Sequence, residues 1–200
     1  GAVVADGAAS TAAVFTTNRF AAAPIELSRR HLAAAGGRCR GLVVNAGNAN
    51  AATGAAGHED ARRTVEVLAA AIDAAPCEVL VNSTGVIGRR LPIDDLCAAI
   101  PRLAAALDGN AAAELARAIM TTDTAPKGAE RRVPAADGGE ISIVGICKGA
   151  GMIRPDMATM IGIVTTDAAI DPAGLDALLR SACDRSFNRL SIDGDTSTND

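Results

Sequence analysis

The stretch Cys39-Arg-Gly-Leu-Val-Val-Asn45, with the two segments that follow it, decides the fold class. It is an apolar run of strand length that contains β-branched residues. From Ala61 to Ala74 the apolar residues recur instead at helical spacing and share one face, which comprises Val65, Leu68, Ala69 and Ile72. A second strand-like run follows at Glu78–Asn82. Strands that alternate with helices predict an α/β protein.

Apolar runs elsewhere in the chain extend this alternation. Further strands are predicted at Ala2–Ala5, Ala12–Thr17, Ile141–Cys147 and Thr159–Thr165. The pair Asp171-Pro172 predicts the start of a helix, because Asp caps helices and Pro is tolerated at the first helical position. The apolar stripe of that helix comprises Leu175, Leu178, Leu179 and Ala182.

Three other segments have helix or turn signals. Asn110 is predicted to cap a helix that continues to Met120. Pro101 interrupts the helical pattern that starts near Pro92, so two short helices are predicted there. The segment from residue 127 to 139 contains charges, a proline and adjacent glycines, and it predicts an exposed loop or hairpin.

The composition is typical of one globular domain and excludes several classes of protein. The 200 residues (20.0 kDa) are 49% hydrophobic and 21% charged, with a formal net charge of −4, which excludes a disordered chain. There is no Trp, no Tyr and no dense Lys/Arg cluster, so nucleic acid is not expected as a partner. The apolar runs are far shorter than the ~18–20 residues that span a bilayer, so no membrane partner is expected either.

The cysteines and the chain ends bear on cellular location. The five cysteines form no CxxC or Cys/His cluster, so neither a disulfide scaffold nor a metal site is predicted; they are Cys39, Cys77, Cys97, Cys147 and Cys183. Reduced thiols and the lack of a leader pattern predict a cytoplasmic protein. The polar loop from residue 193 to 200 leads to no packed element, so we expect the chain to be an internal piece of a longer protein.

Three short polar segments interrupt apolar ones and are candidates for a functional site. Val44–Asn50 has three Asn after a strand, and it predicts either a tight turn or a loop that presents amide donors to a ligand. Asn82–Gly88 also follows a strand. Its backbone N–H groups could converge as an oxyanion hole, or Ser83 or Thr84 could cap a helix. Met120–Thr124 ends a helix, where its hydroxyls and carboxylate would close a turn.

A fourth segment, Gly145–Val164, is the most unusual. A strand leads into Lys148 and a glycine-rich turn, without the pattern of a phosphate loop or a dinucleotide site. Lys148 is either a surface lysine with an exposed amine or an anchor for a carboxylate beside a pocket. His31, near an expected helix start, and His58 follow no obvious nucleophile elbow, although sequence distance alone does not exclude a Ser–His pair.

The fourth segment resembles a known family signature. The run Lys148-Gly-Ala-Gly-Met-Ile-Arg-Pro-Asp-Met-Ala-Thr-Met-Ile161 is similar to that of the ornithine acetyltransferase (glutamate N-acetyltransferase, ArgJ) family of arginine biosynthesis. Four more motifs occur in the order and rough spacing of that family, namely Asn45–Asn50, Asn82–Gly85, Met120–Asp123 and Asp195–Asp200. The resemblance therefore spans nearly the whole chain.

The resemblance implies a fold and a processing step. The fold is the DmpA/ArgJ-like N-terminal-nucleophile fold, here truncated, with mixed sheets and flanking helices. The implied precursor cuts itself between Ala158 and Thr159. Residues 1–158 then form the α-chain portion, and residues 159–200 form the start of the β chain, with Thr159 as its new N-terminus.

The resemblance also implies roles for individual residues. Thr159 is the catalytic nucleophile, and Thr84 with Gly85 forms the oxyanion hole. The implied substrate-binding residues are Thr121, Lys148 and Thr159. At the first of these positions, Thr122 remains an alternative to Thr121.

The implied activity moves an acetyl group from N-acetylornithine to glutamate through acetyl-Thr159, in two half-reactions without a cofactor. An N-terminal threonine suits this chemistry because its own α-amine, with a pKa of about 7.7–8.0, serves as the base. Bifunctional members of the family also use acetyl-CoA as a donor, and the family assembles as α2β2. Members continue far beyond residue 200 and carry further substrate-binding residues there.

Two alternatives to this activity stay open at the level of sequence. The first is an inactive or binding-only fragment of such an enzyme, because the chain is shorter than the family members. The second is a related N-terminal-nucleophile aminopeptidase, in which water takes the place of glutamate as the acyl acceptor.

Overall fold

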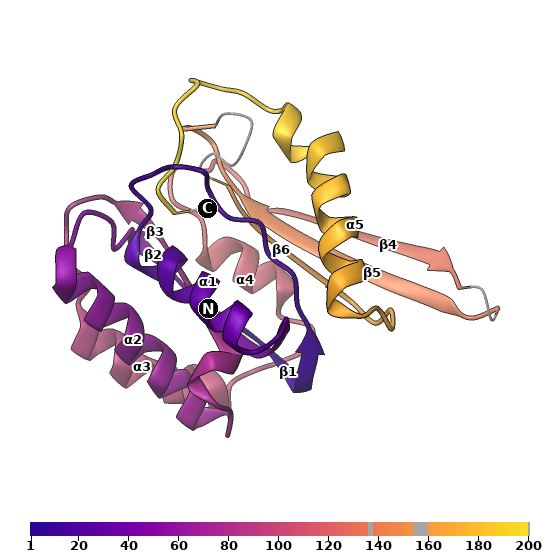
Figure 1. Cartoon of the computed structure of the whole chain (residues 1–200), viewed down its shortest axis with the longest axis horizontal. Coiled ribbons are helices and arrows are strands. Elements are labelled where there is room, and N and C mark those ends of the chain that lie inside the picture. The colour runs from indigo at the N-terminus through magenta and orange to yellow at the C-terminus, as the bar shows by residue number, and fades with distance from the viewer. Residues whose placement is uncertain (136–137, 154–159, 200) are drawn as a thin grey trace.

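Two three-stranded sheets with helices around them make up the molecule (Figure 1). The computed structural model describes residues 1–135, 138–153 and 160–199. The first sheet has the order β1 (Ala2–Ser10), β2 (Arg38–Asn48), β3 (Val79–Val86), and the second has the order β4 (Lys127–Pro134), β5 (Glu140–Lys148), β6 (Ile161–Thr166). The expected α/β class, with mixed sheets and flanking helices, is confirmed.

The described residues form five α-helices and two short 3₁₀ turns. They are α1 (Ala23–Ala34), α2 (Gly54–Ala71), α3 (Ile93–Ala105), α4 (Ala112–Ala118), α5 (Pro172–Arg185), η1 (Pro76–Glu78) and η2 (Phe187–Arg189). The predicted start of α5 is confirmed, because the Asp171 carboxylate accepts hydrogen bonds from the backbone N–H groups of Ala173 and Gly174. The apolar stripe of α5 is less buried than predicted, and Leu178 is 57% exposed.

The first sheet contains both kinds of strand pairing. β1 runs antiparallel to β2, whereas β2 runs parallel to β3, with α2 in the connection between them. In a parallel pair, both strands finish at the same edge of the sheet. The register pairs Asn45 with Ser83, Ala46 with Thr84 and Gly47 with Gly85, so two of the polar segments lie side by side.

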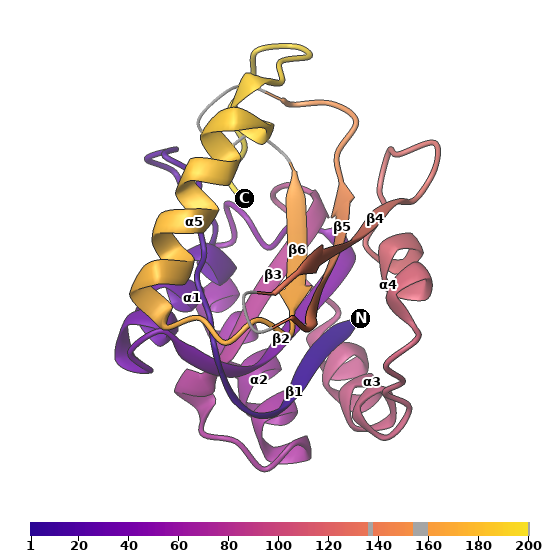
Figure 2. The same cartoon turned by 90° about the vertical axis from the view of Figure 1, so that its right-hand side faces the viewer.

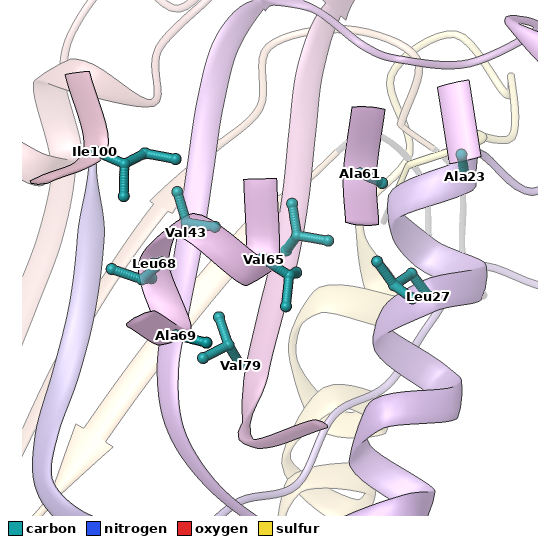
Figure 3. Packing of buried hydrophobic residues seen from close by; sticks show 10 residues of the cluster. Ala23, Leu27, Val43, Ala61, Val65, Leu68, Ala69, Val79 and Ile100 are labelled. Carbon is teal, nitrogen blue, oxygen red and sulfur yellow. The ribbon is translucent and has the colours of Figure 1, made fainter. Parts of the chain in front are cut away.

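Alternation along β2 and β3 gives the first sheet two different faces. Val43, Val79 and Val81 face the helices, where they pack with Val65 and Leu68 of α2 (Figure 3). Leu68 and Val79 are fully buried there. Burial of one such side chain contributes about 1.5–3 kcal/mol, so this cluster holds the helices on the sheet.

The opposite face of the first sheet packs on the second sheet. Val44 of β2 contacts a buried cluster with Ile119 beyond α4, Ile146 of β5 and Ile161 of β6. Figure 2 shows the strands of the second sheet between α5 on one side and α4 on the other. All pairings in this sheet are antiparallel, and β4 is exposed along its whole length, which agrees with the predicted hairpin from residue 127 to 139.

Side chains cover the outer edge of β3. The Ser28 hydroxyl of α1 donates to the Val81 carbonyl oxygen (2.7 Å) and accepts from the Val81 N–H (2.9 Å). One turn later on the same helix, Nδ1 of His31 lies 2.9 Å from the carbonyl oxygen of Val79. Two residues three positions apart on one helix face therefore satisfy the backbone of an edge strand.

The structure corrects one of the predicted strands. Residues 12–17 form no strand, because they pair with no neighbouring strand; Phe15 packs instead beside α1, with the guanidinium of Arg29 over its ring. The strand predicted at residues 2–5 is present and extends to Ser10 as β1.

Three predictions about helix ends and breaks were wrong. Asn110 does not cap α4, since Ala111 holds that position and the Asn110 N–H bonds to Asp108. Pro101 does not split α3, because burial of Ile100 against α2 outweighs the lost hydrogen bond. His31 lies in the last turn of α1, not at a helix start.

Candidate active site

Thr84 and Lys148 meet where the two sheets face each other. Lys148 is the last residue of β5 and shares the inward face of that strand with Ile146, while Thr84 shares the inward face of the first sheet with Val44. The Lys148 Nζ donates a hydrogen bond of 2.8 Å to the Thr84 Oγ1. Lys148 is 2% exposed and Thr84 is 4% exposed. The interpretation of Lys148 as a surface lysine was therefore wrong.

The chemistry of the two groups fixes the direction of this hydrogen bond. An ammonium group has three donors and no acceptor, whereas a hydroxyl has one donor and two acceptor positions. Thr84 must therefore accept from Lys148, and its own hydrogen is left for another acceptor. The Thr84 hydroxyl can therefore donate its hydrogen to another group while the lysine ammonium lies beside it.

Gly85 follows Thr84 at a point where only glycine fits. Its φ is +129°, and a Cβ at this position would lie 2.3 Å from the carbonyl carbon and oxygen of Gly47. The neighbouring strand has no side chain there either, which lets the two backbones approach closely. Thr84 and Gly85 belong to β3, and the next helix starts at Ile93, so the interpretation of Ser83 or Thr84 as a helix cap was wrong.

Asp123, predicted only to close a turn after a helix, also connects two segments of the candidate site. Its carboxylate accepts hydrogen bonds from the N–H groups of Gly149 (2.7 Å) and Thr121 (3.4 Å) and pairs with Lys127 at 2.5 Å. It thereby attaches the Met120–Thr124 segment to the turn after Lys148. Thr121 and Thr122 are both exposed, so neither is favoured for substrate contact.

The charge of Asp123 is stabilised by these contacts. Burial alone would raise the pKa of this carboxyl group, since its side chain is fully enclosed. The hydrogen bonds from Lys127, Gly149 and Thr121 outweigh burial and hold the pKa of Asp123 below its usual value. Asp123 is therefore an anion at neutral pH and accepts from all three donors.

The three Asn of the first polar segment serve the protein itself. The Asn45 Oδ1 accepts from the Ser83 hydroxyl at 2.6 Å, and its Nδ2 donates to the Asn48 carbonyl oxygen at 2.9 Å. Asn48 donates to the carbonyl oxygen of Arg90, and the buried Asn50 donates to that of Gly57. Residues 44–48 continue β2 and pair with β3, so the predicted tight turn is wrong there, and the side-chain amides bond to other groups of the protein.

The comparisons with known proteins identify the family. The model of the ArgJ family matches residues 1–200. The chain belongs to the ArgJ family.

Curated ArgJ proteins are close relatives of this chain. It is 52% identical over 200 residues to the arginine biosynthesis bifunctional protein ArgJ of Chlorobaculum tepidum, covering 99% of this chain and 49% of that protein. The ArgJ protein of Geobacter sulfurreducens is 51% identical over 198 residues, covering 99% of this chain and 50% of that protein. The chain thus spans about half the length of the curated relatives it matches.

Solved ArgJ structures share the fold. The crystal structure of the arginine biosynthesis bifunctional protein ArgJ from Bacillus halodurans superposes with a TM-score of 0.71 at 35% identity, covering 80% of this chain and 81% of that one. An ornithine acetyltransferase from Mycobacterium tuberculosis, complexed with ornithine, superposes with a TM-score of 0.66 at 38% identity, covering 78% of each chain. The expected ArgJ-like fold is confirmed.

Two site residues implied by ArgJ membership, Ala158 and Thr159, lie outside the described residues. The chain is described again from residue 160, and β6 begins at Ile161, which pairs with Lys148. The part of the ArgJ signature that follows Thr159 is thus adjacent in the sheet to the lysine that contacts Thr84.

Other candidate groups are engaged elsewhere or poorly suited to catalysis. His58 lies 3.7 Å from Glu26, and His31 contacts the backbone of β3. Burial raises the pKa of the Cys39 thiol to about 11, so this cysteine is a weak nucleophile at neutral pH. No helix within residues 1–135, 138–153 and 160–199 has both the length and the apolar character that a membrane crossing requires. In that same part of the chain, no three His, Cys, Asp or Glu side chains cluster as metal ligands would.

Proposed function

We propose that this chain is part of an acetyltransferase of arginine biosynthesis that transfers an acetyl group from N-acetylornithine to glutamate. The observation that carries the proposal is the hydrogen bond from Lys148 to Thr84 beside Gly85, found in a chain of the ArgJ family. The names of its relatives support arginine biosynthesis, and one relative was solved with ornithine. The whole protein would be a cytoplasmic α2β2 assembly that requires no cofactor and has acetyl-CoA as an additional donor.

Self-cleavage generates the nucleophile. The Thr159 hydroxyl adds to the carbonyl carbon of Ala158, and the C–N bond then breaks with transfer of a proton to the Thr159 nitrogen. Water hydrolyses the resulting ester between the two residues. Residues 1–158 become the α-chain portion, which stays associated with the β chain, and Thr159 keeps its hydroxyl and gains a free α-amine, which acts as the base in later steps.

Acetyl transfer follows in two half-reactions. The Thr159 Oγ attacks the acetyl carbonyl of N-acetylornithine while the α-amine takes up the hydroxyl proton. That proton passes to the departing amine, so that ornithine leaves and acetyl-Thr159 remains. The amine of glutamate then attacks the acetyl ester, releasing N-acetylglutamate and restoring the Thr159 hydroxyl.

Thr84, Gly85 and Lys148 stabilise the charge that develops in each attack. The Thr84 hydroxyl and the Gly85 N–H would donate to the oxyanion, and the Lys148 ammonium adds positive charge 2.8 Å from the hydroxyl oxygen. Loss of one oxyanion donor costs roughly 10²–10³ in turnover in other enzymes. Lys148 also attracts the α-carboxylate that both amino-acid substrates carry, with Thr121 at the same end of the site.

The chain connection supports Thr159 as the attacking residue. Thr159 precedes Ile161 by two residues, and two residues of extended chain span at most about 7 Å. Ile161 pairs with Lys148 across the second sheet. The chain connection thus limits how far the proposed nucleophile can lie from Ile161, the residue that pairs with Lys148.

The decisive test uses the full-length protein and a matched threonine control. Incubation with N-acetylornithine should add one acetyl group to the peptide that begins at Thr159, detected by mass spectrometry after rapid denaturation. Thr159→Ala should give one uncut chain without an adduct. Thr165→Ala, which changes an exposed threonine of β6, should be cut and acetylated normally.

Three outcomes would contradict the proposal. Normal cutting of the Thr159→Ala variant would remove Thr159 as the nucleophile. An intact wild-type chain without an adduct would favour the binding-only fragment. An adduct that is released to water at the same rate with and without glutamate would favour the aminopeptidase alternative.

A further inference from the structure

The segment from residue 196 to 199, which we name the C-terminal strap, returns to the first sheet. Thr16 donates through Oγ1 to the Ser197 carbonyl oxygen at 2.8 Å, and the Ala22 N–H donates to the Thr198 carbonyl oxygen at 2.8 Å. Figure 1 shows this yellow part of the chain beside the ends of β2 and β3. The strap is thus held on one side by residues 16–22, far from it in the sequence.

Nearly all the hydrogen-bonding capacity of the Asn199 side chain is used. Its Nδ2 donates to the carbonyl oxygens of Ser83 (2.9 Å) and Ala49 (2.5 Å), while its Oδ1 accepts from the Thr198 hydroxyl at 2.7 Å. An amide nitrogen has two hydrogens, and both are placed. Asn199 is 5% exposed, so water cannot readily replace these hydrogen bonds when the side chain is changed.

The Ser83 carbonyl belongs to the same peptide group as the Thr84 N–H. Because a peptide group is planar, a hydrogen bond that fixes the Ser83 carbonyl also fixes the orientation of the Thr84 N–H. Along the same edge of β3, the Val79 and Val81 carbonyls contact His31 and Ser28 of α1. Asn199 supplies the third contact of this series, at the position next to the site.

The second carbonyl that Asn199 holds lies at the end of the neighbouring strand. Ala49 directly follows β2, and its N–H donates to the carbonyl oxygen of Val86 at 3.0 Å. One amide group therefore ties the end of β2 to the residue before Thr84. Gly47 and Gly85 lie between these two anchor points, where the backbones approach most closely.

We propose that Asn199 is a positioning residue for the oxyanion hole, which acts by orienting the Ser83–Thr84 peptide. This inference rests on the proposed function, since it assigns Thr84 and Gly85 to the stabilisation of the oxyanion. Displacement of a catalytic group by about 1 Å can cost roughly 10²-fold in rate. A residue that positions the oxyanion hole affects the chemical step, so its loss should lower kcat. Other residues bind the substrate, so KM should change little.

The test replaces Asn199 by Asp in the full-length protein. Asp has the same size but no hydrogen to donate, so it sets two oxygens against the Ser83 and Ala49 carbonyl oxygens. We expect kcat for acetyl transfer to fall about 10- to 100-fold with the KM for N-acetylornithine within about threefold. Asn199→Ser removes both long-range donors without adding charge, and it should also lower kcat with little change in KM. This second variant keeps the test valid if the Asp variant does not fold.

Asn18→Ala is the matched control. Asn18 donates to the Thr196 carbonyl oxygen at 3.1 Å and so holds the same strap, but it touches neither Ser83 nor Ala49 through that bond. We expect its kcat to stay within about twofold of wild type. Equal losses in kcat for Asn18→Ala and Asn199→Ser would show a role in fastening the strap alone and would overturn the proposal.

A crystal structure of the Asn199→Asp protein separates this proposal from the proposed function. A rotated Ser83–Thr84 peptide is expected whatever the enzyme's substrate, so rotation without acetyl transfer by the wild type would defeat only the proposed function. An unmoved peptide, or an unchanged kcat in an active enzyme, would overturn the role of Asn199.

Discussion

The first sheet is enclosed on both faces, whereas the outer face of the second sheet is only partly covered. Helices cover one face of the first sheet and the second sheet covers the other, so Val43, Val44 and Val81 are all nearly inaccessible to water. On the outer face of the second sheet, Val164 is 56% exposed and Val133 is 39% exposed. The enclosed sheet supplies the fixed backbone at Thr84 and Gly85, and the more open sheet brings Lys148 to it.

The two sheets therefore contribute different groups to the candidate site. The oxyanion donors that we propose, Thr84 and Gly85, need fixed positions, and a strand packed on both faces provides them. The second sheet delivers a charge and the start of β6, close to the position where self-cleavage is proposed. Four experiments test this difference between the two sheets.

The largest effect is expected at the contact between the sheets. Lys148→Met keeps a long side chain but removes the donor to Thr84, so the hydroxyl no longer has a positive charge beside it. Acetyl transfer by the full-length protein should fall roughly 10²–10³-fold. The measurement is kcat, with the unfolding midpoint checked in parallel. Turnover within threefold of wild type in a folded variant would show that the contact has no catalytic role.

The next prediction compares two losses of stability in the 200-residue chain, each caused by truncation of one apolar side chain at one of the two sheets. Leu68→Ala removes a fully buried side chain from the cluster between α2 and the first sheet, and it should lower the free energy of unfolding by about 2–5 kcal/mol. Val164→Ala truncates an exposed side chain and should change it by less than about 0.5 kcal/mol. Urea denaturation measures both, and similar losses would contradict the contrast in enclosure.

A smaller effect is expected where the sheets differ at their edges. Ser28→Ala leaves the N–H and carbonyl of Val81 without their side-chain partner, which should cost about 1–3 kcal/mol in the free energy of unfolding. Glu130→Gln on the exposed edge strand β4 should cost less than about 0.5 kcal/mol. Hydrogen exchange at the Val81 amide, faster only in the Ser28 variant, would locate the effect at that edge.

The smallest effect depends on pH and concerns Asp123. Its pKa is lowered in the folded protein, so the folded state binds a proton there less readily than the unfolded state. The stability this provides is present above the unfolded pKa of about 3.9 and is lost as pH falls through the lower folded pKa. Asp123→Asn should therefore weaken the acid-side fall in stability, measured by urea denaturation from pH 7 to pH 3. An identical pH profile for both proteins would exclude Asp123 as a contributor.

The parts of the fold that rest on local pattern could be predicted from sequence. The apolar run in Cys39–Asn45, the helical face around Leu68 and the cap at Asp171 all follow from side chains a few residues apart. The Ala12–Thr17 prediction failed because a β-branched run becomes a strand only when a partner strand is available. The α3 prediction failed because burial of Ile100 is a tertiary effect that overrides the local cost of Pro101.

Local pattern singled out the Asn82–Gly88 segment and Lys148 with alternative interpretations, and the family resemblance then assigned roles to individual residues. Thr84, Gly85 and Lys148 were named through the family signature, and the structure adds that Lys148 is buried and donates to Thr84. Asn199 received no role, and Asp123 was predicted only to close a turn, although both occur in the quoted motifs. Their partners lie 26 and 116 residues away at Gly149 and Ser83, and no spacing rule in a single sequence connects such positions.

The covered edge of β3 also limits how this protein can associate with other chains. A foreign strand that approaches there finds Val79 and Val81 already bonded to side chains of α1, so it gains no continuous ladder. Growth of the first sheet by strand addition is thereby directed to β1, at the opposite margin. The side that carries Thr84 is thereby protected from the strand pairing that leads to domain exchange and fibril formation.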